Sequence, residues 1–104
     1  MSTSVMLRLI AVLVGIACLA GCGGAPVQEM SDARQAIAAA RVAGASERAP
    51  ADLDAAQAAI ARAESHLQAQ EYTRARIAAL EAKHRASIAL ANSEQANAAS
   101  DPAH

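Results

Sequence analysis

Alanine dominates this chain beyond its first fifth. Residues 23–104 hold 28 alanines, but only eleven Val, Ile, Leu or Met residues and one aromatic residue, Tyr72. Alanine has the highest helix propensity and lets backbones approach closely, yet it adds little apolar surface to a core. Such a chain favours thin helices that pack close together. We therefore expect an all-α fold, an antiparallel three-helix bundle or helical hairpin, with marginal stability as an isolated monomer.

Gly44 and Pro50 divide the helical pattern into segments. Apolar residues alternate at spacings of three and four before Gly44, which predicts a first helix over 27–43. Pro50 suits the first position of a helix, and the same alternation follows it, so a second helix is predicted over 50–69.

The apolar stripe loses its phase between Leu67 and Tyr72. Continuing from Leu67 would place polar residues on the stripe, whereas a new stripe of alanines begins at Tyr72. This break predicts a turn near 69–71 and a third helix over 71–97. Because no glycine or proline interrupts the sequence there, one continuous helix over 51–98 is the alternative.

The third predicted helix has two apolar faces with charged residues between them. Opposite its alanine stripe lies a face of larger side chains: Ile77, Leu80, His84 and Ile88. Such a helix either packs one face on each of two neighbours or exposes the larger face to a partner. We expect the first arrangement, with the larger face as a possible partner surface in the second. Residues 98–104 are small and polar and are predicted to be a disordered tail.

The N-terminal segment has the pattern of an export signal. Arg8 precedes an apolar run from Leu9 to Ala20, which is too short to span a membrane. The run ends in Leu19-Ala20-Gly21-Cys22, which resembles the lipobox of bacterial lipoproteins.

The lipobox resemblance implies a division of the chain and a location. It implies removal of a signal peptide, residues 1–21, and acylation of Cys22. Residues 22–26 would then be a lipidated tether and 27–97 a helical domain. Gly23, rather than aspartate, after the cysteine implies the outer membrane, on its periplasmic face.

The order of the sequence blocks also resembles a known family. Ala49-Pro50-x-x-Leu53-x-x-Ala56, followed by Tyr72-x-x-Ala75, is similar to the DUF4398 domain over about 26–95. That family is a helical domain of bacterial envelope lipoproteins and lends no catalytic residues. Its members often have a glycine or other turn former before the tyrosine, where this chain has Gln70-Glu71.

Charge and composition exclude several function classes. After cleavage before Cys22 the chain would carry 8 basic and 10 acidic side chains, which gives no electrostatic surface for nucleic acid. The shortage of aromatic rings disfavours a small-molecule pocket, and we expect no cofactor. The cleaved chain would hold no free thiol for catalysis or metal binding, because Cys18 leaves with the signal peptide.

Histidines and glutamates are the only candidates for chemistry. Glu81-x-x-His84 has the spacing of helical di-iron sites, but those sites need a second copy, which this chain lacks. Ser65 and His66 are sequence neighbours and diverge on a helix. We therefore predict no catalytic residues, no metal site and no enzyme activity. A metal-binding protein, with His66 and His84 converging beside Glu64 and Glu81, is an alternative.

These features predict a non-enzymatic, lipid-anchored envelope protein that acts as a helical interaction or structural module. Its partners would be the membrane, through lipid on Cys22, and either another envelope protein or a second copy of the chain. Another possibility is a homo-oligomeric alanine coiled coil of the murein-lipoprotein type, which requires the continuous helix over 51–98.

Overall fold

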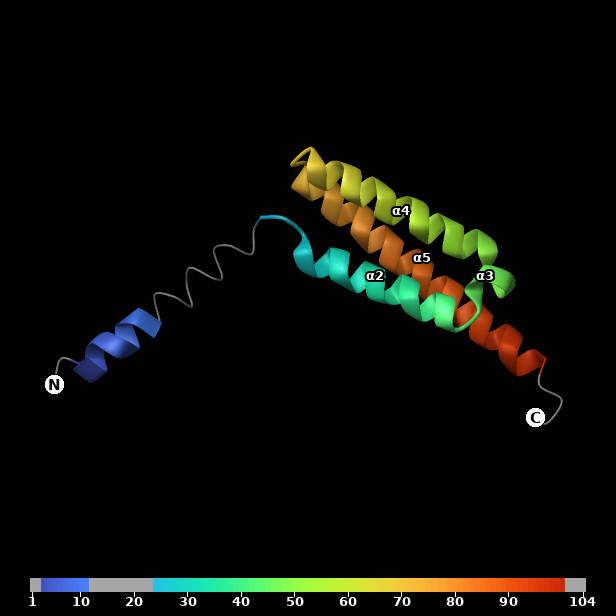
Figure 1. Cartoon of the computed structure of the whole chain (residues 1–104), viewed down its shortest axis with the longest axis horizontal. Helices are drawn as coiled ribbons and strands as arrows, with labels where there is room; N and C mark the ends of the chain where they lie inside the picture. Colours follow the sequence, from blue (N-terminus) through green and yellow to red (C-terminus); the bar gives the residue numbers. More distant parts are fainter. Residues whose placement is uncertain (1–2, 12–23, 101–104) are drawn as a thin grey trace.

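The computed structural model describes residues 3–11 and 24–100. Residues 3–11 are helical, and the bundle that follows consists of α2 (Val27–Val42), α3 (Ala45–Arg48), α4 (Pro50–Gln68) and α5 (Tyr72–Ala99) (Figure 1). The described residues contain no strand. The all-α prediction is confirmed. None of the helices described is long and apolar enough to cross a membrane.

The helix boundaries follow the residues that predicted them. Gly44 adopts φ 89°, a left-handed conformation that suits glycine, and its N–H donates to the carbonyl of Arg41 at the end of α2. Pro50 is the first residue of α4. The residues between them form one short helix, α3, whose first residue, Ala45, is buried against the bundle.

A turn separates α4 from α5, so the continuous helix over 51–98 is wrong. Gln70 has φ 60°, and its N–H donates to the carbonyl of Leu67, while the N–H of Glu71 donates to that of His66. This pair of hydrogen bonds is the Schellman arrangement that usually places glycine at the left-handed position. Here a glutamine occupies it, and the chain turns back on itself.

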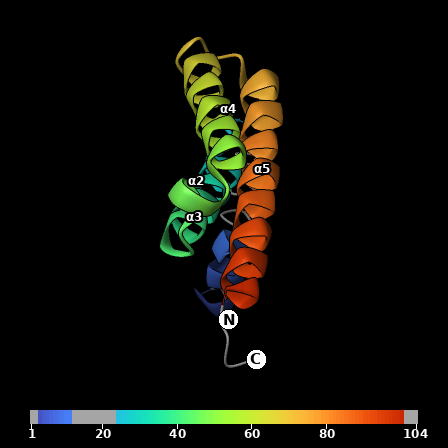
Figure 2. The ribbon, with the colours of Figure 1, turned by 90° about the vertical axis from the view of Figure 1, so that its right-hand side faces the viewer.

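The long helix α5 packs against both α2 and α4 (Figures 1 and 2). In Figure 1 it lies between them, and the view turned by 90° in Figure 2 shows its two neighbours on the same side of it. Its buried positions hold nothing larger than serine: Ala75, Ala78, Ala79, Ala82, Ala86, Ala89 and Ser93. The predicted alanine stripe therefore lies within the face that α5 contributes to the core, together with Ala78, Ser93 and the partly buried Leu90.

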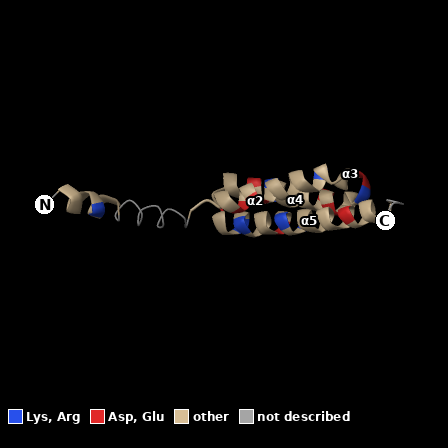
Figure 3. Ribbon diagram, turned by 90° about the horizontal axis from the view of Figure 1, so that it is seen from below, with Lys and Arg blue, Asp and Glu red and all other residues tan. Residues whose placement is uncertain are grey.

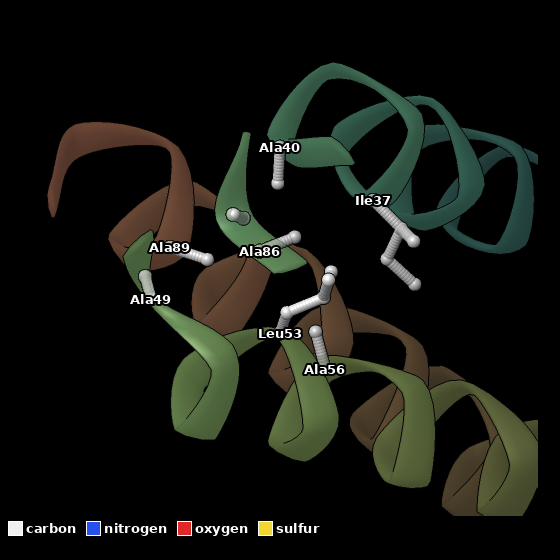
Figure 4. Packing of buried hydrophobic residues seen from close by; sticks show 8 residues of the cluster. Ile37, Ala40, Ala49, Leu53, Ala56, Ala86 and Ala89 are labelled. Carbon is white, nitrogen blue, oxygen red and sulfur yellow. The ribbon is translucent and has the colours of Figure 1, made fainter. Parts of the chain in front are cut away.

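The larger apolar side chains of the core come from the other two long helices. Ile37 of α2 and Leu53 of α4 pack into one cluster with Ala86 and Ala89 of α5 (Figure 4). Near the middle of the bundle, Ala82 contacts alanines of α2 and α4 in a cluster with no exposed surface. Small residues on α5 let both neighbours approach its backbone.

This arrangement corrects the expectation for the larger face of the third helix. We expected α5 to place its alanines on one neighbour and its larger side chains on the other. Both neighbours instead share the alanine side, and Ile77 and Leu80 on the opposite side are largely exposed. The helix also continues to Ala99, two residues beyond the predicted end at 97, and 101–104 lie outside the described residues.

Candidate functional site

The outer face of α5 is the most distinctive surface of the bundle. Ile77 is 63% exposed and Leu80 is 50% exposed, although both are large apolar residues. His84 is exposed one turn further along, and Ile88 is half-buried. We call these four residues the outer α5 face. The structure therefore brings the predicted partner-surface residues together on one side of one helix.

Ion pairs between helices flank the outer α5 face on both sides. On the α4 side, Arg62 donates to Glu81 at 3.0 Å. On the α2 side, Arg76 donates to Glu29 at 3.1 Å, and Lys83 lies 3.9 Å from Asp32. Figure 3 shows the two signs of charge interspersed along the bundle. The charged flanks predicted for this helix thus join it to its neighbours, and they leave an apolar strip between them.

The structure does not bring the candidate metal ligands together. Glu64 pairs with Arg34 of α2, Glu81 pairs with Arg62, and His66 hydrogen-bonds Glu71 at the α4–α5 turn. His84 is exposed on the outer α5 face, three residues after Glu81, whose carboxylate is already paired with Arg62. Within the two described stretches, no group of three His, Cys, Asp or Glu side chains is placed to hold a metal ion. The convergence that the metal-binding alternative requires is wrong.

The α4–α5 turn carries a small charged cluster. His66 Nδ1 lies 3.1 Å from one carboxylate oxygen of Glu71, and Arg74 Nη1 donates to the other at 3.1 Å. The hydrogen bond with His66, and then the positive charge of Arg74, hold the pKa of Glu71 below its ordinary value of 4.5. His66 and Arg74 both hydrogen-bond Glu71, and these bonds stabilise the turn at Gln70.

A groove between α2 and α4 was not predicted from the sequence. It has a volume of about 310 Å³ and is lined by Ile37 and Ile60 with polar side chains at its rim. The ion pair between Arg34 and Glu64 joins the two helices beside it. Its residues lie on two helices that contact each other far less than each contacts α5, so no periodicity within one helix could have indicated it.

Cys22, the predicted lipidation site, lies outside the described residues, as does most of the predicted signal peptide. The structure begins again at Gly24, whose carbonyl oxygen accepts a hydrogen bond from Arg76 Nη2 at 3.2 Å. The sequence did not predict this contact of Arg76, because the contact depends on where α2 begins relative to α5.

Comparison with known proteins identifies the family to which this bundle belongs. Residues 28–104 match the family described as Domain of unknown function (DUF4398). No curated protein and no solved structure gives a match. The family match covers nearly all of the bundle just described, including the α4–α5 turn. The chain belongs to the DUF4398 family.

Proposed function

We propose that this protein is a non-enzymatic, lipid-anchored module of the bacterial cell envelope, which presents the outer α5 face to another envelope component. The lipobox-like Leu19-Ala20-Gly21-Cys22 supports the anchor, and Gly23 supports the periplasmic face of the outer membrane. The bundle then begins only a few residues from the proposed lipid.

The exposure of Ile77 and Leu80 is the observation that carries the interaction role. Residues 23–104 contain only eleven Val, Ile, Leu or Met residues, and the core is built largely from alanine. A chain so short of apolar volume nevertheless leaves these two side chains in solvent, on one face and one turn apart. Exposed apolar residues on a contiguous face are typical of protein contact surfaces.

The flanks of the outer α5 face support the same role. Contact surfaces commonly have an apolar centre and a polar rim. Here the centre is formed by Ile77 and Leu80, while Glu81 and Lys83 lie on either side of it, held by ion pairs to α4 and α2. A partner could therefore bury the apolar strip without burying an unpaired charge.

Site-specific cross-linking in intact cells tests this proposal. A photo-cross-linking residue at Ile77 should give a discrete adduct of higher mass, whereas the same residue at Val42 should not. Val42 is the matched control, because it is also an exposed aliphatic residue of a helix but is not on the outer α5 face. The mass of the adduct distinguishes a second copy of the chain from a different protein.

Two outcomes would contradict the interaction role: no adduct from Ile77, or equal adducts from Ile77 and Val42. Ile77→Ser and Leu80→Ser should reduce the adduct formed from a cross-linker at Ile88, while the folded state keeps its stability because both side chains are exposed. A Cys22→Ser variant tests the anchor separately, since it should move the protein out of the membrane fraction.

A further inference from the structure

The start of the bundle is held against the first turns of α5. Arg76 is at the centre of this contact: its Nε donates to Glu29 at 3.1 Å, and its Nη2 donates to the carbonyl of Gly24 at 3.2 Å. Pro26, between these two residues, is fully buried. The N–H of Met30 donates to the carbonyl of Pro26. The chain is therefore fixed to the bundle from Gly24 onward.

This fixed point lies at one end of the bundle. Arg76 is in the second turn of α5, close to the α4–α5 turn formed by Ala69, Gln70 and Glu71. Figure 1 shows the start of α2 and the α4–α5 turn at the same end, with α3 and the last turns of α5 at the other. Since α4 has 19 residues at about 1.5 Å each, the two ends are about 28 Å apart.

Only two peptide steps separate Gly24 from Cys22. An extended chain spans at most about 3.6 Å per residue, so Cys22 can lie no more than about 7 Å from Gly24. An acyl group on Cys22 would place that residue at the membrane surface. The geometry points to a defined orientation: the α4–α5 turn faces the lipid headgroup layer, while α3 and the C-terminal end of α5 point away. This inference rests on the acylation of Cys22 in the proposed function.

The chemistry of the two regions favours this upright orientation over one in which the bundle lies flat. The turn presents polar side chains to solvent, among them Gln70, Thr73 and Arg74, together with the ring of Tyr72. Tyrosine suits a membrane interface, because one end of its side chain is apolar and the other is polar. Along the sides of the bundle, Arg34, Arg62 and Arg76 each pair with a glutamate of a neighbouring helix, so these basic side chains are not free to bind anionic lipid.

Fluorescence quenching on vesicles tests the orientation with the full, acylated protein. Cys18 would leave with the signal peptide and the sulfur of Cys22 would be in a thioether, so an introduced cysteine would be the one free thiol. A fluorophore is attached at Thr73→Cys near the turn or, as the matched control, at Ser46→Cys in α3. Both positions are exposed polar residues. The vesicles contain phosphatidylcholine and phosphatidylglycerol, with a quencher on a fraction of the headgroups.

We expect quenching at position 73 to be several-fold stronger than at position 46. Equal quenching, as in a bundle lying flat on its outer α5 face, or stronger quenching at position 46 would overturn the inference. Failure of the acylated protein to float with vesicles would instead contradict the proposed anchor, so the two failures are distinguishable.

A longer tether tests the cause of the orientation. Inserting twelve Gly and Ser residues after Gly23 should bring the ratio of quenching at positions 73 and 46 close to one, because the bundle would no longer be held at the surface by its α4–α5 end. An unchanged ratio would overturn the role assigned to the short tether. Circular dichroism of each variant checks that the bundle remains folded.

Discussion

Arg76 Nε on α5 lies 3.1 Å from Glu29 Oε1 on α2, and the two side chains are only about one-third exposed. The residues are 47 positions apart in the sequence, so their contact fixes the first turns of α2 against the start of α5. The same guanidinium also binds the backbone carbonyl of Gly24. One arginine therefore joins the packing of the bundle to the position of its tether.

Replacing Arg76 should destabilise the bundle more than replacing a neighbouring arginine. Arg76→Met removes the hydrogen bonds to Glu29 and Gly24 but keeps the apolar stem, and we expect a loss of about 1–2 kcal/mol in the free energy of unfolding. Arg74→Met is the control, because Arg74 is 71% exposed, and it should change stability by less than about 0.5 kcal/mol. Urea unfolding measures both; equal effects would contradict this account of Arg76.

The alanine stripe of α5 should not tolerate larger side chains. Ala82 has no exposed surface and lies between alanines of α2 and α4, so Ala82→Leu should destabilise the bundle by about 1–3 kcal/mol. Ala91→Leu makes the same chemical change at an exposed position of the same helix and should shift stability by less than about 0.5 kcal/mol. Thermal and urea unfolding compare the two variants, and a harmless leucine at position 82 would show that the helices are not packed as described.

Replacing the left-handed turn residue, Gln70, by glycine should stabilise the fold. Gln70 has φ 60°, a conformation that costs a non-glycine residue about 1–2 kcal/mol, partly offset by the greater backbone freedom of unfolded glycine, about 0.4–1 kcal/mol. We therefore expect Gln70→Gly to raise the melting temperature. Gln35→Gly, at an exposed position within α2, should lower it, because glycine weakens a helix interior. A lower melting temperature for Gln70→Gly would contradict the turn geometry.

The charged cluster at the turn should make stability depend on pH in one direction. The pKa of Glu71 is lowered in the folded protein by His66 and Arg74, so its carboxylate stabilises the fold above the ordinary value of 4.5. This contribution is lost as pH falls through the lowered pKa. Glu71→Gln should therefore melt below the wild type at neutral pH, and the two melting temperatures should converge in acid. A difference between the two melting temperatures that grows as the pH falls would contradict this account of Glu71.

Local sequence signals predicted most of the fold. Gly44 and Pro50 marked helix ends because their backbone preferences are strong, and the loss of phase between Leu67 and Tyr72 marked the α4–α5 turn without any turn-forming residue. The phase signal succeeded because a hairpin reorients both helices toward a common core. The short helix α3 was missed, since its single turn depends on the burial of Ala45 against elements distant in the sequence.

The periodicity of the sequence could not predict which helices pack against which face of α5. Two apolar faces on one helix indicated two contacts, but periodicity does not say which neighbour takes which face. Both neighbours pack on the alanine face, because the small side chain of alanine lets α2 and α4 approach the stripe that includes Ala79 and Ala82. Exposure of Ile77 and Leu80 was predicted only in the second alternative, and the structure shows these two side chains exposed.

The proposed anchor at Cys22 is the central claim, since the location of the protein, the role of its outer α5 face and its orientation all depend on it. Intact-mass spectrometry of the protein extracted from membranes tests it most directly. We expect a chain that begins at Cys22 and carries the added mass of a diacylglyceryl group and a further acyl chain. A chain that begins at Cys22 with no added mass, or one that retains residues 1–21, would contradict the account.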